Sequence, residues 1–287
     1  MLATGAVAVT LEDNADQPLL EPGVGETPLW RQTRLTGLYP ADTDMAAVLA
    51  TFPEQVLAEG SQRVEILEDK DWEREWMQHY RPMRFGTRLW VCPSWITPPE
   101  PDAVNLMLDP GLAFGTGTHA TTELCLRQLD ELSPVGMTAV DYGCGSGILA
   151  VAALKLGAAR VLGVDNDPQA LVASRDNAGR NAIPEQLLPL ALPGDIPMDQ
   201  WSGNSDLVIA NILAGPLLEL SDTLLRFLRP GGTMLLSGLL NTQAGELCEH
   251  YRSRISLSVS AEKDGWVGLV VVCLLYTSDA ADDASSV

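Results

Sequence analysis

Residues 140–147, Val-Asp-Tyr-Gly-Cys-Gly-Ser-Gly, have the composition of a loop that lets a small ligand approach the backbone. Glycine has no Cβ atom, so it tolerates tight turns with positive φ and close contact with a ligand. The loop lies between a predicted strand and a predicted helix, where parallel sheets bind nucleotides. Asp165 ends the next predicted strand, 22 residues after Gly143. A carboxylate at this distance is expected to bind both hydroxyls of a ribose.

The glycine spacing distinguishes between cofactors. A dinucleotide-binding loop has the pattern G-x-G-x-x-G, but the position of its third glycine is Ile148 here. The observed G-x-G-x-G, preceded by Asp141, resembles the first motif of S-adenosylmethionine-dependent methyltransferases. We therefore predict S-adenosylmethionine as the cofactor. A nicotinamide or flavin dehydrogenase, and glycines that serve only a tight turn, are the alternatives.

Asn211 is the candidate catalytic residue. It follows the apolar run 206–210, a predicted buried strand, and so is expected at the same sheet edge as the glycines. Methyltransferases that act on planar nitrogens carry Asn or Asp followed by Pro-Pro and an aromatic residue. Ala214 occupies the aromatic position here, so an aliphatic amine is the favoured acceptor. Alternatively, Asn211 is a turn residue that closes the end of the strand.

The segment 109–122, DPGLAFGTGTHATT, predicts a glycine-rich loop followed by a helix. One interpretation has the loop fold over the cofactor, with Thr122 donating a hydrogen bond to it. The alternative is that Thr121 or Thr122 only caps the helix. His119 has the chemistry of a general base, but no carboxylate partner is visible in the sequence, which disfavours that role.

Strands and helices alternate after about residue 120, which predicts a doubly wound parallel sheet in an α/β fold. The predicted helices are Thr121–Leu132, Gly147–Leu156, Pro168–Asn181 and Leu217–Leu228. The predicted strands are Thr138–Asp141, Arg160–Asp165, Leu187–Leu192 (weakened by Pro189), Asp206–Ala210 and Thr233–Ser237.

The region before residue 100 predicts a smaller α/β unit followed by an aromatic-rich segment. Its predicted strands are Gly5–Leu11, Arg34–Leu38 and Arg88–Cys92, and its predicted helices are Asp42–Phe52, with Asp42 as N-cap, and Asp69–Tyr80. Residues 97–102, TPPEPD, are expected to form a linker or turn.

Composition excludes several classes of protein. The chain has 287 residues and a net charge of −20, from 18 Lys and Arg against 38 Asp and Glu, which disfavours direct binding to nucleic acid. Five cysteines without a CxxC pair and only three histidines predict neither a disulfide framework nor a zinc site. The first residues contain no basic segment, so we expect no secretory signal there, and the longest apolar run, Trp266–Tyr276, is too short to span a membrane. We therefore expect a cytoplasmic protein without bound metal.

The motifs together resemble the bacterial ribosomal protein L-eleven methyltransferase family. The resemblance covers about residues 1–270 and is carried by the segments 68–95, 109–126, 140–178 and 206–220. It implies a small N-terminal recognition domain and a Rossmann-like methyltransferase domain. The implied activity is methylation of lysine ε-amines and of the N-terminal α-amine of a large-subunit ribosomal protein. The implied cofactor contacts are Thr122, Gly143, Gly145, Asp165 and Asn211.

The resemblance also suggests domain boundaries. We expect a recognition domain at 1–60, apparently truncated, a connecting segment at 61–105, a methyltransferase domain at 106–270, and a disordered tail foreign to the family at 271–287. The expected partner is a basic ribosomal protein, modified by a monomeric enzyme. Another methyltransferase of the superfamily acting on a different protein or small-molecule amine, and an inactive binding module that retains the cofactor fold, remain as alternatives.

Overall fold

The computed structural model describes residues 1–15, 28–53, 62–67, 80–109 and 117–274. The chain divides into two compact units, Met1–Trp76 and Met77–Val287, so the division falls within the predicted connecting segment 61–105. In the described part of the chain, no helix is both long and apolar enough to cross a membrane. Residues 69–79 of the helix predicted at Asp69–Tyr80 lie outside the described residues.

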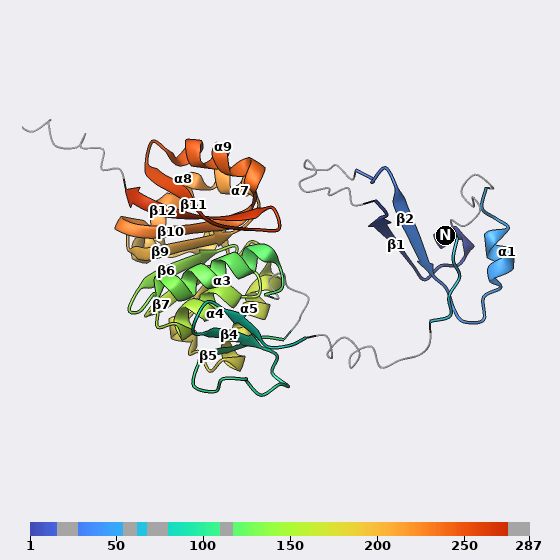
Figure 1. Cartoon of the computed structure of the whole chain (residues 1–287), viewed down its shortest axis with the longest axis horizontal. Helices are drawn as coiled ribbons and strands as arrows, with labels where there is room; N and C mark the ends of the chain where they lie inside the picture. Colours follow the sequence, from blue (N-terminus) through green and yellow to red (C-terminus); the bar gives the residue numbers. More distant parts are fainter. Residues whose placement is uncertain (16–27, 54–61, 68–79, 110–116, 275–287) are drawn as a thin grey trace, which may run out of the picture. The chain divides into compact units, whose positions relative to one another are not determined.

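The first unit contains an antiparallel hairpin of β1 (Ala8–Asp13) and β2 (Thr33–Leu38), preceded by the short 3₁₀ helix η1 (Leu2–Thr4) (Figure 1). Both strands lie where the sequence predicted strands. A single short helix, α1 (Met45–Leu49), follows β2 in the described part of this unit.

The predicted cap of this helix was wrong. Asp44, not Asp42, is the N-cap of α1, and its carboxylate accepts hydrogen bonds from the backbone N–H groups of Ala46 and Ala47. A cap residue must directly precede the first helical residue for its side chain to reach these donors. Asp42 lies two residues too early, so the helix is shorter than the predicted range.

The second unit is built on a seven-stranded sheet with the order β11-β12-β10-β9-β6-β7-β8. Five strands, β10, β9, β6, β7 and β8, are parallel, while β12 runs antiparallel to both β10 and β11. The strands are β6 (Thr138–Tyr142), β7 (Arg160–Val164), β8 (Leu190–Ala191), β9 (Ser205–Asn211), β10 (Leu228–Leu240), β11 (Ile255–Lys263) and β12 (Trp266–Leu274).

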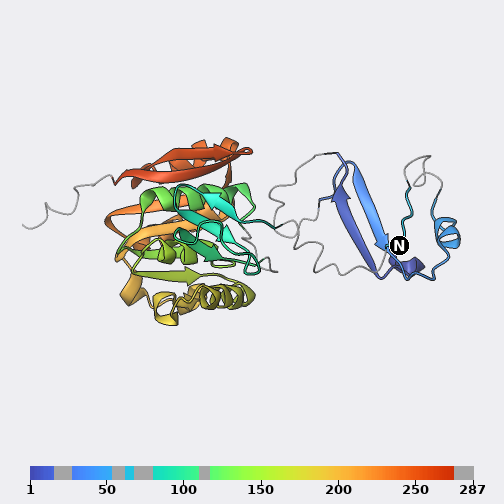
Figure 2. The same ribbon diagram turned by 60° about the horizontal axis from the view of Figure 1, so that its bottom comes forward.

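Helices cover both faces of this sheet (Figures 1 and 2). One core includes residues of α3 (Ala120–Leu132), α4 (Ile148–Lys155) and α5 (Pro168–Arg180). The other includes residues of α6 (Met198–Trp201), α7 (Ala214–Glu219), α8 (Ser221–Phe227) and α9 (Asn241–Tyr251). Short 3₁₀ helices, η2 (Glu185–Leu187) and η3 (Pro193–Asp195), flank β8.

Strand β9 shows why helices must pack against both faces of the sheet. Leu207 and Ile209 contribute to the first core, and Val208 and Ala210 to the second. Successive side chains of a strand point to opposite faces, so an uninterrupted apolar strand must be buried on both. The predicted doubly wound α/β sheet is confirmed.

Two predicted elements of the second unit, a strand and a helix, are changed in the structure. The strand expected at Leu187–Leu192 is reduced to Leu190–Ala191, because Pro189 has no N–H to donate to a ladder. The helix expected at Leu217–Leu228 begins earlier and is split into α7 and α8 at Leu220. Pro216 lies in the first turn of α7, where a missing N–H costs no intrahelical bond.

Helix α9 and the β11–β12 hairpin were not predicted. Most of the apolar run that was too short for a membrane span forms β12, an interior strand between β10 and β11. β12 ends at Leu274, so residues 271–274 of the predicted tail belong to a strand, and residues 275–287 lie outside the described part.

A small sheet of β3 (Met83–Phe85), β4 (Leu89–Cys92) and β5 (Val104–Met107) is attached to α3 through Asp130. The buried carboxylate of Asp130 accepts hydrogen bonds from the N–H and hydroxyl of Thr87, at 2.6 and 3.0 Å, and from Nε of Arg88 at 3.2 Å. Burial alone would raise the pKa of Asp130, but these hydrogen bonds and the charge of Arg88 outweigh it and lower the pKa.

We expect Asp130→Ala to lower the free energy of unfolding by about 1–3 kcal/mol, because it leaves buried donors without an acceptor. Urea denaturation of the variant measures the loss. Glu131→Ala, at the neighbouring exposed position of α3, is the control and should change stability little. Equal losses in the two variants would contradict this role of Asp130.

Candidate functional site

The order of the strands reverses next to β6. From β6 the chain continues to β7 and β8 on one side of the sheet and then crosses to β9 on the other. In parallel sheets, such a reversal opens a crevice at the carboxyl ends of the strands, where ligands bind. Gly143 follows β6, Asp165 follows β7, and Asn211 ends β9. The structure therefore brings the sequence-predicted residues to one edge of the sheet.

The glycine loop has the positive φ angles that its composition predicts. Gly143, Gly145 and Gly147 have φ angles of 78°, 54° and 76°, in the left-handed region. A Cβ atom on Gly143 would lie 2.3 Å from Cγ2 of Ile212, which follows Asn211 at the end of β9. Glycine at 143 thus lets the loop lie directly against the end of β9, a contact that sequence reasoning did not foresee.

Asp165 is tied to the glycine loop. Its Oδ2 accepts a hydrogen bond from the N–H of Gly145 at 2.9 Å, and its Oδ1 accepts one from the N–H of Asp167 at 3.0 Å. Each carboxylate oxygen has a second lone pair. The half-buried carboxylate is held in place by two backbone donors and can still accept hydrogen bonds from two hydroxyls.

Thr122 and Asn211 meet across the same edge. Nδ2 of Asn211 lies 3.5 Å from the hydroxyl oxygen of Thr122, whose side chain is buried. Oδ1 of Asn211 is also buried and has no hydrogen-bond partner among the described residues. Because an unpaired buried acceptor is costly, this oxygen is suited to accept a hydrogen bond from a bound ligand.

The cap of α3 is His119 rather than a threonine. Nδ1 of His119 lies 3.3 Å from the N–H of Thr121, which donates to it, and 2.8 Å from the Thr121 hydroxyl. The reading in which Thr122 only caps the helix was therefore wrong, and the Thr122 hydroxyl contacts Asn211 instead. The His119 ring also packs edge-on against Trp266, with ring centroids 5.0 Å apart.

Asp141 is a further buried acid at this edge, and it was not among the predicted site residues. It is the fourth residue of β6, and its Oδ2 accepts a hydrogen bond at 3.0 Å from the N–H of Ala150 in the first turn of α4. Gly147, the N-cap of α4, has no side chain to do this, so Asp141 caps the helix from the strand. Its other oxygen has no partner among the described residues.

Burial disfavours the charged form of the Asp141 carboxyl group. Burial raises the pKa of its carboxyl, the hydrogen bond from Ala150 lowers it, and the nearby charge of Asp165 raises it; together they bring the pKa to about 7. The acid that precedes the glycine motif was visible in the sequence, but nothing there showed its complete burial.

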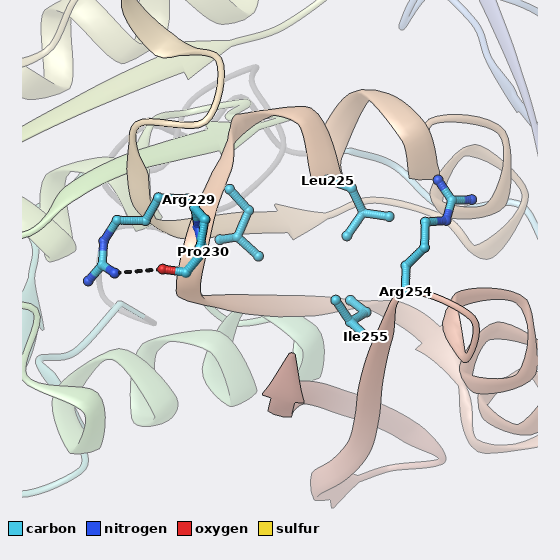
Figure 3. Close-up of a pocket in the computed structure, with 6 residues that line it drawn as sticks. Leu225, Arg229, Pro230, Arg254 and Ile255 are labelled. Carbon is cyan, nitrogen blue, oxygen red and sulfur yellow. Dashed lines mark hydrogen bonds between the residues drawn. The ribbon is translucent and has the colours of Figure 1, made fainter. Parts of the chain in front are cut away.

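Two cavities of the described residues lie away from this edge. One, of about 220 Å³, is lined by Leu225, Leu228, Arg229, Pro230, Arg254 and Ile255 (Figure 3). Leu228 pairs with Ser205 at the start of β9, so this cavity lies at the amino ends of β9 and β10, opposite Asn211. The other, of about 530 Å³, lies between α5 and residues 183–190.

Comparison with known proteins gives consistent matches. The sequence profile of the family described as Ribosomal protein L11 methyltransferase (PrmA) matches residues 1–273. Ribosomal protein L11 methyltransferase of Vibrio cholerae serotype O1 is 55% identical over 269 residues, covering 93% of this chain and 90% of the relative. That of Serratia proteamaculans is 55% identical over 268 residues, with the same coverage of both chains.

A solved structure is also similar. The crystal structure of ribosomal protein L11 methylase from Lactobacillus delbrueckii subsp. bulgaricus aligns with a TM-score of 0.59 and 32% sequence identity. The alignment covers 67% of this chain and 98% of that one.

The raised pKa of Asp141 predicts a pH-dependent stability. Between about pH 4, where an aspartate of the unfolded chain titrates, and about pH 7, the native state retains a proton that the unfolded chain has lost. Stability from this group is therefore complete below about pH 4 and is lost as the pH rises to about 7. Asp141→Asn keeps an acceptor for Ala150 and does not titrate.

We expect the stability of Asp141→Asn relative to wild type to increase from pH 5 to pH 8, by up to about 1.4 kcal/mol per pKa unit of the shift. Guanidinium denaturation at several pH values measures it. Asp176→Asn, on the exposed side of α5, is the control and should show no such trend. A difference between Asp141→Asn and wild type that does not change with pH would rule out the raised pKa.

Proposed function

Because the chain belongs to the ribosomal protein L11 methyltransferase family, we propose that it methylates ribosomal protein L11 at lysine ε-amines and at the N-terminal α-amine, with S-adenosylmethionine as cofactor. Membership of this family makes the chain a methyltransferase. The observation that carries the finer proposal is the arrangement at one sheet edge of a fixed carboxylate, Asp165, and the Thr122–Asn211 pair.

The residues at this edge fit S-adenosylmethionine. When bound, this cofactor supplies a methyl group attached to a positively charged sulfonium. Asp165, held by the N–H groups of Gly145 and Asp167, is suited to accept hydrogen bonds from both ribose hydroxyls. The backbone of Gly143 and Gly145 would hold the cofactor from the side of β6, and Thr122 and Asn211 would hold it from the side of β9.

The side chain of Asn211 supports an amine acceptor. An amine attacks only when it is neutral, and a lysine with an ordinary pKa near 10.4 must first lose its proton. Desolvation at the sheet edge lowers that pKa. The unpaired Oδ1 of Asn211 can then accept a hydrogen bond from a remaining N–H of the amine and aim its lone pair. Such positioning supplies a large part of the rate of group transfer.

The charge of the chain supports a basic protein as partner. A net charge of −20 favours association with a positively charged protein and opposes direct contact with a nucleic acid backbone. We infer that the enzyme acts in the cytoplasm, where its thiols stay reduced; Cys92, Cys125, Cys144 and Cys248 are free.

We expect Asp165→Ala to weaken S-adenosylmethionine binding at least about tenfold, because a charged hydrogen-bond acceptor contributes roughly 1.5–3 kcal/mol. Isothermal calorimetry with the purified protein measures the dissociation constant. Asp176→Ala removes an exposed aspartate from α5 and is the matched control. An unchanged dissociation constant in Asp165→Ala would exclude Asp165 from the cofactor site.

We expect wild-type enzyme to add methyl groups to purified ribosomal protein L11, and Asn211→Ala to lose turnover about a hundredfold while remaining folded, because the amine loses its positioning acceptor. Mass spectrometry of L11 locates and counts the methyl groups, at saturating cofactor. Asn204→Ala is the control, since Asn204 bonds only to the Gln200 carbonyl among the described contacts of its side chain.

Near-wild-type turnover in Asn211→Ala would remove Asn211 from the mechanism. A wild-type enzyme that binds the cofactor but leaves L11 unmodified would contradict the proposed acceptor.

A further inference from the structure

We propose that the ion pair between Glu123 and Lys263 is a latch that positions the start of α3 for methyl transfer. The latch joins residues 140 positions apart in the chain: Nζ of Lys263, at the turn of the β11–β12 hairpin, donates to Oε2 of Glu123. Glu123 directly follows Thr122, which contacts Asn211. The proposal rests on the proposed function, in which Thr122 and Asn211 bound the reacting groups.

The hairpin turn is well suited to carry a fixed side chain. Asp264 and Gly265 form a two-residue turn with φ angles of 51° and 80°. Positive φ at both positions is typical of the type I′ turn, which matches the twist of the two strands. The carbonyl of Gly265 also accepts a hydrogen bond at 2.9 Å from the N–H of Asn241, the first residue of α9. The turn is therefore anchored independently of α3.

The hairpin contacts α3 at two points. Lys263 and Trp266 are directly opposed in the ladder, so their side chains lie on the same face of the hairpin. Lys263 contacts Glu123, and the Trp266 ring packs against the ring of His119. His119 and Glu123 are four residues apart and thus lie on the same side of the helix start.

Thr122 lies in the sequence between His119 and Glu123, the two residues that contact the hairpin. The two contacts therefore fix the first turn of α3, from which the Thr122 hydroxyl reaches Asn211. The hairpin also lies close to the next turn, because a Cβ atom on Gly268 would be only 3.7 Å from Cβ of Leu124.

The Glu123–Lys263 ion pair is partly shielded from solvent. The Glu123 side chain is 17% exposed and that of Lys263 is 40% exposed. Burial alone would raise the pKa of Glu123, but the hydrogen bonds from Lys263 and Arg127 outweigh it and lower the pKa, so the carboxylate stays charged at neutral pH. A carboxylate in the first turn of a helix also interacts favourably with the helix dipole.

The test uses Glu123→Gln and Lys263→Met in the full-length protein. Each removes one charge and keeps the size of the side chain. Because small displacements of positioning groups have large effects on group transfer, we expect each variant to lower kcat for L11 methylation about tenfold. We expect the double variant to be no worse than Glu123→Gln alone, since Glu123→Gln already removes the pair with Lys263 along with the pair with Arg127. Lys263→Arg, which keeps the charge, should restore most of kcat.

Arg252→Met is the matched control. Arg252 forms an ion pair with Glu249 on α9, with side chains 74% and 65% exposed, and its loss should leave kcat unchanged. Hydrogen–deuterium exchange needs no substrate, so it tests whether the ion pair holds the start of α3 in place even if the proposed acceptor is wrong. Glu123→Gln and Lys263→Met should speed exchange at residues 119–124 and 264–266, and Arg252→Met should not.

Unchanged exchange and unchanged kcat in both single variants would overturn the latch. A loss of thermal stability with kcat of the folded protein unchanged would also overturn it, since the pair would then be structural only. Faster exchange in an enzyme that does not methylate L11 would leave the latch standing and contradict the proposed acceptor.

Discussion

The reversal of strand order between β6 and β9 is the constraint on which the site depends. It makes the chain leave the sheet in opposite directions from two neighbouring parallel strands, the arrangement at whose carboxyl edge open parallel sheets bind ligands. Gly143 can then lie against Ile212 without a Cβ in the way, and Asp165, from the next strand, can reach the N–H of Gly145. Asp165 and Asn211 lie at the ends of strands far apart in the sequence, and only this topology brings them to one edge.

The carboxyl groups of Asp165 and Asp141 lie in different environments at this edge of the sheet. Asp165 lies partly exposed, with two backbone donors. Asp141 is completely buried and caps α4 with one oxygen while the other lacks a partner among the described residues. The cost of that burial is the reason that its pKa rises to about 7. An apolar residue at 141 would avoid this cost, but it would leave the first turn of α4, and hence the glycine loop, without its cap.

The sequence predicted the parts of this structure that local pattern encodes. Gly143, Asp165 and Asn211 each follow or end an apolar strand, so their shared edge follows from an alternating α/β pattern. Contacts between distant segments left no such signal: neither the Gly145–Asp165 hydrogen bond nor the Glu123–Lys263 pair follows from the spacing of its members. The hairpin was missed because β12 is an apolar run without alternation, and the cap of α1 was misplaced because both Asp42 and Asp44 satisfy the sequence rule.

We propose that the carboxyl edge of β7, β6 and β9 binds the cofactor beside Asn211. A crystal structure of the protein with S-adenosylhomocysteine would locate the bound cofactor. We expect both ribose hydroxyls within hydrogen-bond distance of the Asp165 carboxylate, and the sulfur on the side of Thr122 and Asn211. A ligand bound at the opposite edge, such as in the cavity between Arg229 and Arg254, or one that leaves Asp165 without contact, would contradict this proposal.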